Sequence, residues 1–397
     1  MRTQVGIVGA GPAGLLLSHL LARAGIDSVV LEARSRTYVE RRIRAGVLEH
    51  PTVELLREVG VGARMDAEGL PHEGISLRFD GMDHRIDFAD LVGKGIVVYG
   101  QQEVVKDLIA ARLDDGATIE FGVSGVHLNG VEGSTPSITY TDAAGVAREL
   151  RCDVIAGCDG FHGVSRHAFP AGALTAFDRE YPFGWLGVLA KAAPTHAELV
   201  YSANERGFAL YSMRSPEVTR LYLQVPSDTN AATWSDAAIW DELNLRLAAE
   251  GFTLNEGPFL ERPSVTGMRS VVFEPMRHGR LFLAGDAAHI VPPTGAKGMN
   301  LAIADVQVLA DALTGFFATG SETGLDEYSA TCLRRVWRAE HFSWWMTSML
   351  HRFGEGDAAG DPFGRRLQLS QLRYTVSSRA ASTSLAENYV GLPYGAC

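Results

Sequence analysis

The N-terminal segment has apolar runs at two different spacings, separated by glycines. Residues 5–8 form a short apolar run of strand length, whereas residues 15–24 place leucines at helical spacing and end at Gly25. A second apolar run, 28–31, is followed at once by Glu32. A strand, a helix and a strand in this order predict a βαβ unit whose strands are parallel and buried.

In the middle of the chain the pattern changes to longer strands with alternating apolar and polar residues. Four such strands and a following amphipathic helix are predicted at residues 185–191, 198–203, 208–214, 220–225 and 236–247. This alternation indicates an antiparallel sheet that is covered on one side. It places Ser212 and Arg214 on one face of their strand. Arg220, Tyr222 and Gln224 share one face of the next strand.

Shorter elements are predicted in the rest of the chain. A hairpin, a strand and a helix are expected at residues 76–79 with 85–88, 96–99 and 102–113. A meander inserted between the halves of the first domain is expected at residues 118–121, 137–141 and 147–150. An apolar strand at 281–284 turns at Gly285, and a helix begins after Gly298. The Trp- and Met-rich stretch 325–352 is interpreted as a subunit contact.

These elements predict a mixed α/β (α+β) protein. Its expected parts are a discontinuous Rossmann-like nucleotide-binding domain with an inserted β-meander, an antiparallel-sheet substrate domain and a helical C-terminal region. The nucleotide-binding domain is expected at 1–173 and 267–300, the substrate domain at 174–266, and the C-terminal region at 301–397.

Composition and charge argue against several classes of protein. The chain has 397 residues, 46% of them hydrophobic, and a formal net charge of −11, which argues against nucleic acid as a partner. No apolar stretch is expected to reach the length of a membrane span, and the first strand begins too early for a signal peptide. The four cysteines lack the spacing of metal ligands, so no metal site and a reducing, cytoplasmic location are expected.

A glycine-rich turn joins the first strand to the first helix. It has the form Gly9-x-Gly11-x-x-Gly14, and Glu32 ends the second strand. This combination is the fingerprint of a dinucleotide-binding βαβ unit. The glycines let a pyrophosphate approach backbone N–H groups, and Glu32 would bind ribose hydroxyls.

Two groups of basic residues each have two interpretations. The arginines of segment 41–44 either lie on a charged surface helix or neutralise phosphates beside the nucleotide site. Arg214 and the nearby hydroxyl groups either capture a small carboxylate or belong to a solvated sheet face. The residue pattern by itself leaves both alternatives open.

Residues 281–300 combine an apolar strand, a polar turn and a helix start. The turn carries Asp286, Pro292, Pro293 and Lys297. Unpaired N–H groups and the helix dipole at such a helix start favour an electron-rich ligand. The stretch is therefore predicted to line a binding site.

Three separated motifs resemble the fingerprints of the FAD-dependent aromatic hydroxylases. They are the Gly-x-Gly-x-x-Gly of residues 9–14, the Cys-Asp-Gly of 158–160 and the Gly-Asp-Ala-Ala-His of 285–289. Further segments resemble the branch of this family that acts on 4-hydroxybenzoate, at residues 42–49, 155–163, 181–187, 290–298, 342–347 and 387–394. The resemblance covers essentially the whole chain.

The resemblance implies a flavoprotein monooxygenase that converts 4-hydroxybenzoate to 3,4-dihydroxybenzoate (protocatechuate). FAD is the implied cofactor, NADPH or NADH and O2 are the implied co-substrates, and a C4a-hydroperoxyflavin is the implied oxidant. A homodimer is the implied assembly. The same chemistry on 3-hydroxy- or 4-aminobenzoate is one alternative, and a flavin-binding sensor without turnover is an alternative of another class.

The resemblance also implies roles for individual residues around the substrate. Arg214 would pair with the carboxylate, and the other implied substrate residues are Tyr201, Ser212, Met213, Tyr222, Pro293 and Thr294. A relay of Tyr201, Tyr389 and His72 would carry the phenol proton to solvent. The main-chain carbonyl of Pro293 would face the same phenol.

A larger set of residues is implied around the two nucleotides. For FAD the set is Gly9, Gly11, Ala13, Gly14, Glu32, Arg42, Ile43, Arg44, Ala45, Gly46, Val47, Gln102, Asp159, Asp286, Lys297, Gly298, Met299 and Asn300. For NAD(P)H it is Tyr38, Arg42, Arg44, His162 and Arg269. Lys297 and the helix start at Gly298 would stabilise the negative charge of the reduced flavin.

Two positions depart from the family pattern. Ala13 stands where serine is common, so one polar contact to the FAD pyrophosphate is expected to be missing. Ala33 stands where a basic residue is usual, whereas Tyr38 and Arg42, which could hold a 2′-phosphate, are present. The choice between NADH and NADPH is therefore left open.

Overall fold

A six-stranded sheet forms the nucleotide-binding half of the protein. The computed structural model describes residues 1–43, 46–353 and 361–394. The strand order of this sheet is β18-β19-β12-β1-β2-β8. The strands span Arg277–His278, Leu281–Leu283, Val154–Gly157, Val5–Val8, Ser28–Glu32 and Thr118–Phe121. All neighbours are parallel except β18 and β19, as expected for buried strands connected by crossovers.

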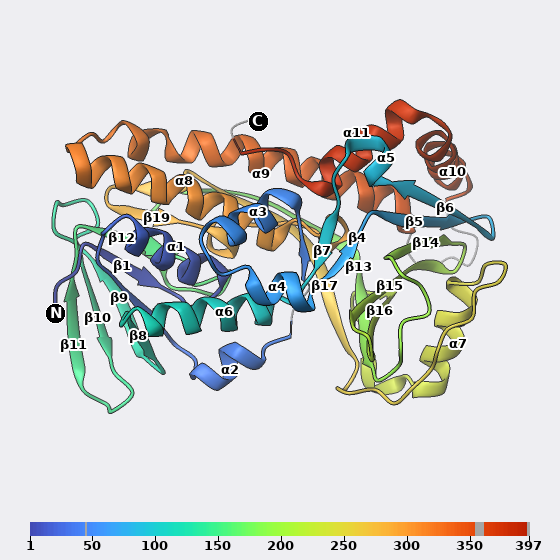
Figure 1. Ribbon diagram of the computed structural model, residues 1–397, viewed down its shortest axis with the longest axis horizontal. Coiled ribbons are helices and arrows are strands. Elements are labelled where there is room, and N and C mark those ends of the chain that lie inside the picture. Colours follow the sequence, from blue (N-terminus) through green and yellow to red (C-terminus); the bar gives the residue numbers. More distant parts are fainter. Residues whose placement is uncertain (44–45, 354–360, 395–397) are drawn as a thin grey trace.

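The predicted βαβ unit is confirmed. Helix α1 (Pro12–Arg23) connects β1 to β2 and begins with a proline in its first turn, where a missing N–H costs nothing. Its leucines at 15, 16, 17 and 21 are buried against the sheet. Helix α6 (Gln101–Asp114) also packs against α1, which places both helices over the same strands (Figure 1).

One predicted strand belongs to a different sheet. The strand at Thr118–Phe121 was expected in the meander, but β8 pairs with β2 in parallel and forms an edge of the main sheet. The meander consists instead of β9 (Ser124–Asn129), β10 (Ser137–Thr141) and β11 (Ala147–Arg151). The expectation failed because the partner of a short edge strand is far away in the sequence and leaves no local signal.

The second half of the protein is built on an eight-stranded sheet. Its order is β20-β17-β13-β16-β15-β14-β5-β6. The strands span His289–Ile290, Ser264–Glu274, Thr175–Ala190, Val218–Pro226, Gly207–Ser215, Val200–Asn204, Gly74–Phe79 and Met82–Asp87. The hairpin β5–β6 comes from the N-terminal part of the chain, and its strand β5 is parallel to β14. The sheet is therefore mixed rather than purely antiparallel.

Both faces of this sheet are buried, which corrects the expectation of cover on one side only. Helix α7 (Asp236–Arg246) packs on β14, β15 and β16 and buries one face. The other face packs against α9 (Thr323–Leu350) and α11 (Arg379–Val390). Strands β14 and β15 have buried residues at both alternating positions, whereas β16 alternates buried with half-buried positions.

Shorter elements complete the structure. A small three-stranded sheet has the order β3-β7-β4, with strands at Val47–Leu48, Ile96–Val98 and Leu70–His72. The remaining helices are α2, α3, α4, α5 and α10, at Arg36–Arg41, His50–Glu58, Ala63–Glu68, Phe88–Val92 and Pro362–Ser377.

Helix α8 (Gly298–Thr319) is the most apolar long helix of the C-terminal region. Its length and mean hydropathy would allow it to cross a membrane, contrary to the expectation that no stretch reaches this limit. Yet it packs between α1 and α9, and 56% of its most apolar stretch is buried inside the fold. This pattern is also that of a core helix.

The interpretation of the 325–352 stretch as a subunit contact requires correction. Most of its large apolar side chains lie in the protein's own core, namely Phe342, Met346, Met349 and Leu350. Trp337 and Trp344 are the tryptophans of α9 that keep substantial exposure. Helix α9 passes over both sheets (Figure 1), so its apolar residues are used to join the two halves of the chain.

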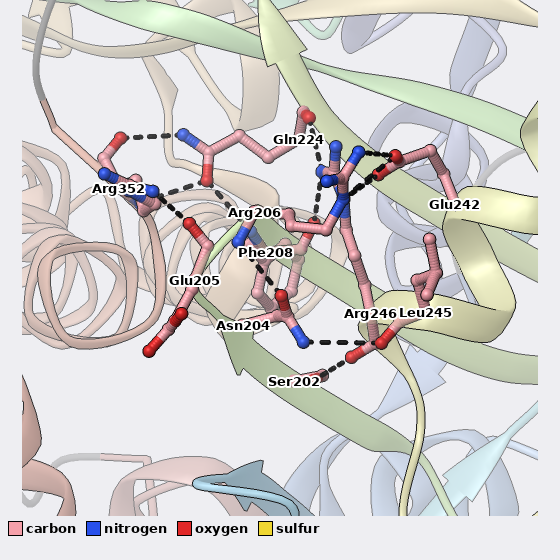
Figure 2. A network of polar contacts seen from close by, with 10 residues as sticks. All are labelled: Ser202, Asn204, Glu205, Arg206, Phe208, Gln224, Glu242, Leu245, Arg246 and Arg352. Atoms are coloured by element: carbon pink, nitrogen blue, oxygen red, sulfur yellow. Dashed lines mark hydrogen bonds and ion pairs between the residues drawn. The ribbon is translucent and has the colours of Figure 1, made fainter. Parts of the chain in front are cut away.

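A polar network fastens the end of α9 to the second sheet (Figure 2). The side-chain oxygen of Gln224 accepts from the backbone N–H groups of Phe208 and Arg352, each at 3.0 Å. Its amide nitrogen donates to the carbonyl of Arg352 at 2.7 Å. Arg246 of α7 donates to the carbonyl of Gln224 at 2.8 Å and pairs with Glu242. Helices α7 and α9 are thus both fixed to strands β15 and β16.

Candidate active site

The glycine turn after β1 leaves space for a ligand at the start of α1. A Cβ on Gly9 would lie 2.4 Å from the carbonyl oxygen of Cys158, and one on Gly14 would lie 2.0 Å from that of Gly9. These two positions therefore require glycine for close packing. Among the described residues nothing lies within 4 Å of a Cβ placed on Gly11, and no side chain caps this helix start. Open space over unpaired N–H groups fits a pyrophosphate.

Glu32 is held at the end of β2 beside this turn. Its carboxylate accepts from the backbone N–H of Ala10 at 2.8 Å and from that of Arg34 at 2.7 Å. Ala13 is buried behind the turn and offers no polar atom, as its replacement of serine implied. The geometry is compatible with ribose binding by Glu32, which stays a prediction.

Two further acceptors in this half have polar atoms without a partner. One oxygen of Asp159 accepts from the backbone N–H and the hydroxyl of Ser165, both at 2.9 Å, while its other oxygen is buried and unpaired. The side-chain oxygen of Gln102 is buried and unpaired as well. Unsatisfied buried acceptors are costly unless a ligand completes them, so both residues fit an FAD site.

The stretch after β19 forms two short turns before α8. Gly285 takes a left-handed conformation (φ 62°), and its N–H donates to Asp305 at 2.9 Å. Asp305 also bonds His289 at 2.6 Å, and both are buried. Asp286 itself is exposed. The turn is therefore fixed from behind while its predicted flavin-binding carboxylate faces outward.

Lys297 is engaged inside the protein. Its ammonium donates to Glu49 at 2.7 Å and to the carbonyl of Tyr389 at 3.2 Å, and it also reaches the carbonyl of Asn388. Burial lowers the pKa of Lys297, and the Glu49 carboxylate acts in the opposite direction. Any effect of Lys297 on a flavin would thus arise from its charge at a distance. Sequence reasoning missed Glu49, although it ends the family-like segment 42–49.

Asn300 joins the same region to the segment before α3. Its side chain accepts from the N–H of Glu49 at 3.0 Å and donates to the carbonyl of Val47 at 2.9 Å. Gly46 is required here because a Cβ would lie 2.2 Å from the carbonyl of Tyr99. Gly298 and Met299 form the half-buried first turn of α8. These residues surround one region, as predicted for a flavin site.

The basic segment near residue 42 is only partly described. Arg42 and Ile43 follow the short helix α2 and are exposed. Arg44 and Ala45, predicted for both nucleotides and for FAD, lie outside the described residues. Helix α2 ends at Arg41, so the charged surface helix considered for segment 41–44 includes Arg41 and stops before Arg42.

The residues predicted for NAD(P)H lie in two places. Tyr38 is exposed on α2. Arg269 and the exposed His162 both lie beside Phe161, whose ring is 5.0 Å from the guanidinium and 5.1 Å from the imidazole. Arg269 already pairs with Asp178, at 2.8 Å from its Nε. A phosphate would have to compete with this carboxylate for Arg269.

Arg214 forms the basic end of a polar cluster on β15 and β16. Its Nη1 donates to the hydroxyl of Ser212 at 3.2 Å and to the carbonyl of Met213 at 2.8 Å, while its Nε is buried without a partner. Burial lowers its pKa, and Tyr222 acts in the opposite direction. Within the described ranges no carboxylate pairs with Arg214. A cation in this state is suited to binding an anion.

Two phenols in contact form a second polar group, with Tyr201 on β14 of the same sheet. The hydroxyls of Tyr201 and Tyr389 lie 2.5 Å apart, and both residues are buried. Burial raises both pKa values. Pro293 is exposed in the nearby turn, where its carbonyl accepts from the N–H of Ala296 and keeps one lone pair. The structure thus brings the predicted pair of tyrosines together.

A line of contacts that the sequence did not reveal runs from Tyr222 to Thr294. The ring of Trp185 packs 4.9 Å from that of Tyr222, and its N–H donates to His351 at 2.7 Å. The other ring nitrogen of His351 bonds the carbonyl of Thr347 at 3.1 Å. The hydroxyl of Thr347 then donates to that of Thr294 at 2.9 Å. Thr347 ends the family-like segment 342–347, which is the signal that could have indicated it.

The burial of His351 predicts that the free energy of unfolding decreases in acid. Burial lowers its pKa from an ordinary value of 6.5 to about 3. Between these values the unfolded chain binds a proton that the folded chain rejects, so stability falls as pH decreases from 6.5. At pH 5 the cost is about 2 kcal/mol. Urea unfolding at pH 7 and pH 5 measures it, and His351→Gln should reduce the difference; an unchanged difference would contradict the assignment.

Comparison with known proteins identifies the class to which this protein belongs. Residues 2–343 match the family described as FAD binding domain, so the protein is a flavoprotein. The chain is 49% identical over 396 residues to p-hydroxybenzoate hydroxylase of Acinetobacter baylyi, covering 99% of this chain and 96% of the relative. The chain belongs to the p-hydroxybenzoate hydroxylase family of aromatic monooxygenases.

Solved structures agree in fold. The p-nitrophenol 4-monooxygenase of Pseudomonas putida superposes with a TM-score of 0.79 at 20% identity, covering 99% of both chains. An aklavinone-11 hydroxylase in complex with FAD and aklavinone has a TM-score of 0.74 at 22% identity, covering 88% of this chain and 69% of that one. At these identities the likeness concerns the fold alone.

Proposed function

We propose that the protein hydroxylates 4-hydroxybenzoate at C3 to give 3,4-dihydroxybenzoate, using FAD, NAD(P)H and O2. The observation that supports it is a site with two different polar ends. One end is Arg214 without a carboxylate partner in the described part of the chain. The other is the buried Tyr201–Tyr389 pair. A flat ring with a carboxylate opposite a phenol is complementary to both.

The carboxylate would be bound by Arg214 with help from neighbouring hydroxyls. The unpaired Nε of Arg214 and the hydroxyls of Ser212 and Tyr222 lie on adjacent strands of the same sheet. Charge-assisted hydrogen bonds of this kind are short and strong, because burial removes competing water. The carboxylate would also offset the cost of leaving the guanidinium partly buried without an anion.

The phenol would be activated by losing its proton. Tyr201 would hydrogen-bond the phenol oxygen and pass the proton to Tyr389, whose hydroxyl is already in contact. The carbonyl of Pro293 would accept from the phenol before the proton leaves. A phenolate donates electron density to the ring carbon beside it, and this carbon then attacks an electrophilic oxygen. Bound FAD, once reduced, supplies that oxygen from O2.

The nucleotide-binding half would hold FAD. The open start of α1 would bind its pyrophosphate, and the unpaired oxygens of Asp159 and Gln102 would accept from its N–H or O–H groups. Asp286 would bind the ribitol, and the start of α8 would lie at the flavin ring. NAD(P)H would approach from the side of Phe161, where His162 and Arg269 lie.

Product analysis tests the proposal. Protein reconstituted with FAD should oxidise NADH or NADPH faster when 4-hydroxybenzoate is added, and 3,4-dihydroxybenzoate should accumulate. A panel with 3-hydroxy- and 4-aminobenzoate, compared by kcat/KM, decides between the substrates. Bound FAD without any 3,4-dihydroxybenzoate would refute the proposal, and bound FAD without oxidation of any member of the panel would favour a flavin-binding sensor.

A further inference from the structure

His72 cannot be the last group of a proton path to solvent. It ends strand β4, and only 2% of its surface is exposed. Both of its ring nitrogens are buried and have no hydrogen-bond partner in the described structure. The expectation that His72 reaches solvent itself therefore needs correction. A proton arriving at this imidazole requires another carrier to leave the protein.

A cavity of about 460 Å³ opens to solvent beside His72. It is lined by Pro71, Glu73, Arg85, His196, Ala197 and Glu198, so both chain neighbours of His72 take part. Glu198 and His196 are the groups whose charges act on His72. Glu73 follows His72 in the bend between β4 and β5, and Arg85 comes from β6. These four are the titratable and charged groups around the cavity.

Glu198 and His196 are held in a fixed arrangement. The carboxylate of Glu198 accepts from Nε and Nη2 of Arg85 at 2.7 and 2.8 Å. Nδ1 of His196 bonds the backbone of Glu198 at about 3 Å, which leaves Nε2 for the cavity. Arg85 has a second carboxylate partner in Asp87 and so stays neutralised when Glu198 takes up a proton.

We propose that Glu198 and His196 form the outlet through which a proton leaving His72 reaches the water of this cavity. The inference rests on the proposed function, since the proton originates from the substrate phenol. The phenol O–H bond breaks and an N–H bond forms on His72. That N–H bond then breaks as the proton passes to the Glu198 carboxylate, and from there to His196 or to a buffer molecule. No electron is transferred.

The electrostatics of His72 suit a carrier that does not retain the proton. Burial lowers its pKa to about 4, Glu198 acts to raise it, and His196 acts to lower it. Removal of the Glu198 charge would make the imidazole harder to protonate. The step through His72 should therefore become slower even though the tyrosines are unchanged.

The rate of proton release on substrate binding tests the proposed outlet. Oxidised holoenzyme is mixed with 4-hydroxybenzoate in weak buffer at about pH 8, and a pH-indicator dye follows the released proton. Glu198→Gln keeps the shape and the contact to Arg85, and it should slow release about tenfold or more. The dissociation constant of 4-hydroxybenzoate should stay within about twofold of that of the unchanged protein. His196→Gln should show a smaller effect of the same sign.

Controls separate a proton outlet from a structural role. Glu73→Gln removes the same charge from an exposed lining residue and should release protons at the rate of the unchanged protein. Imidazole added to Glu198→Gln should restore the rate with saturation, because a small base replaces the missing carrier. Release in both outlet variants as fast as in Glu73→Gln, or slow release that imidazole leaves unchanged, would overturn the outlet.

The same measurements distinguish this inference from the proposed function. Absence of both proton release and 3,4-dihydroxybenzoate in the unchanged protein would overturn the function and the outlet together. Normal release and product in the unchanged protein, with no change in either outlet variant, would overturn the outlet alone.

Discussion

Arg214→Ala is expected to abolish binding of 4-hydroxybenzoate while FAD stays bound. The guanidinium is the positive charge at the carboxylate end, and within the described ranges no carboxylate neutralises it. Loss of one partner of a partly buried charge pair should raise Kd about a hundredfold or more. Titration of the flavin absorbance with 4-hydroxybenzoate measures Kd, and the flavin spectrum after gel filtration measures retained FAD.

Two further variants make this prediction specific. Arg214→Lys keeps a charge but loses the forked geometry, so its Kd should lie between those of the unchanged protein and of Arg214→Ala. Arg206→Ala removes an exposed arginine of the same sheet that pairs with Glu242, and it should leave Kd unchanged. An unaltered affinity in Arg214→Ala would refute the carboxylate assignment.

Tyr201→Phe is expected to separate consumption of NAD(P)H from product formation. The substitution removes the hydroxyl that contacts Tyr389 at 2.5 Å and leaves the aromatic packing in place. The phenol would then keep its proton, and the ring would attack oxygen more slowly by about a hundredfold. NAD(P)H and O2 should still be consumed, with H2O2 released in place of 3,4-dihydroxybenzoate.

The ratio of product to oxidised NAD(P)H is the measurement for this variant. Tyr181→Phe provides a control, because this buried tyrosine contacts Ser270 and takes no part in the relay. Its ratio should match that of the unchanged protein. A normal ratio in Tyr201→Phe would show that the phenol loses its proton by another route.

Features determined by neighbours in the sequence could be predicted well. The first strand, the glycine turn and the first helix follow from local backbone geometry, and they appear where expected. The same holds for Ser212 and Arg214, which the strand period places on one face and which the structure finds in contact. In these cases spacing alone determines which side chains meet.

Features that depend on distant partners could not be predicted. The hairpin at 74–87 is regular in sequence, but nothing in it indicates pairing with a strand that begins at Val200. The resemblance implies that Lys297 stabilises a flavin, whereas its ammonium bonds Glu49, which lies 248 positions earlier in the chain. The burial of His72 likewise arises from segments far along the chain.

The long strands β13 and β17 bring the two ends of the inserted segment together. Thr175 is paired with Glu274, so the two ends of segment 175–274 lie side by side. A chimaera with a related hydroxylase could therefore exchange residues 175–274 through a single pair of neighbouring junctions. Such a graft would also have to carry the hairpin 74–87. Strand β5 of this hairpin pairs with β14, and Arg85 of β6 bonds Glu198, which lies just before β14. A graft of these two segments would carry Tyr201, Arg214 and Tyr222 of the proposed site but leave Pro293 and Tyr389 to the recipient.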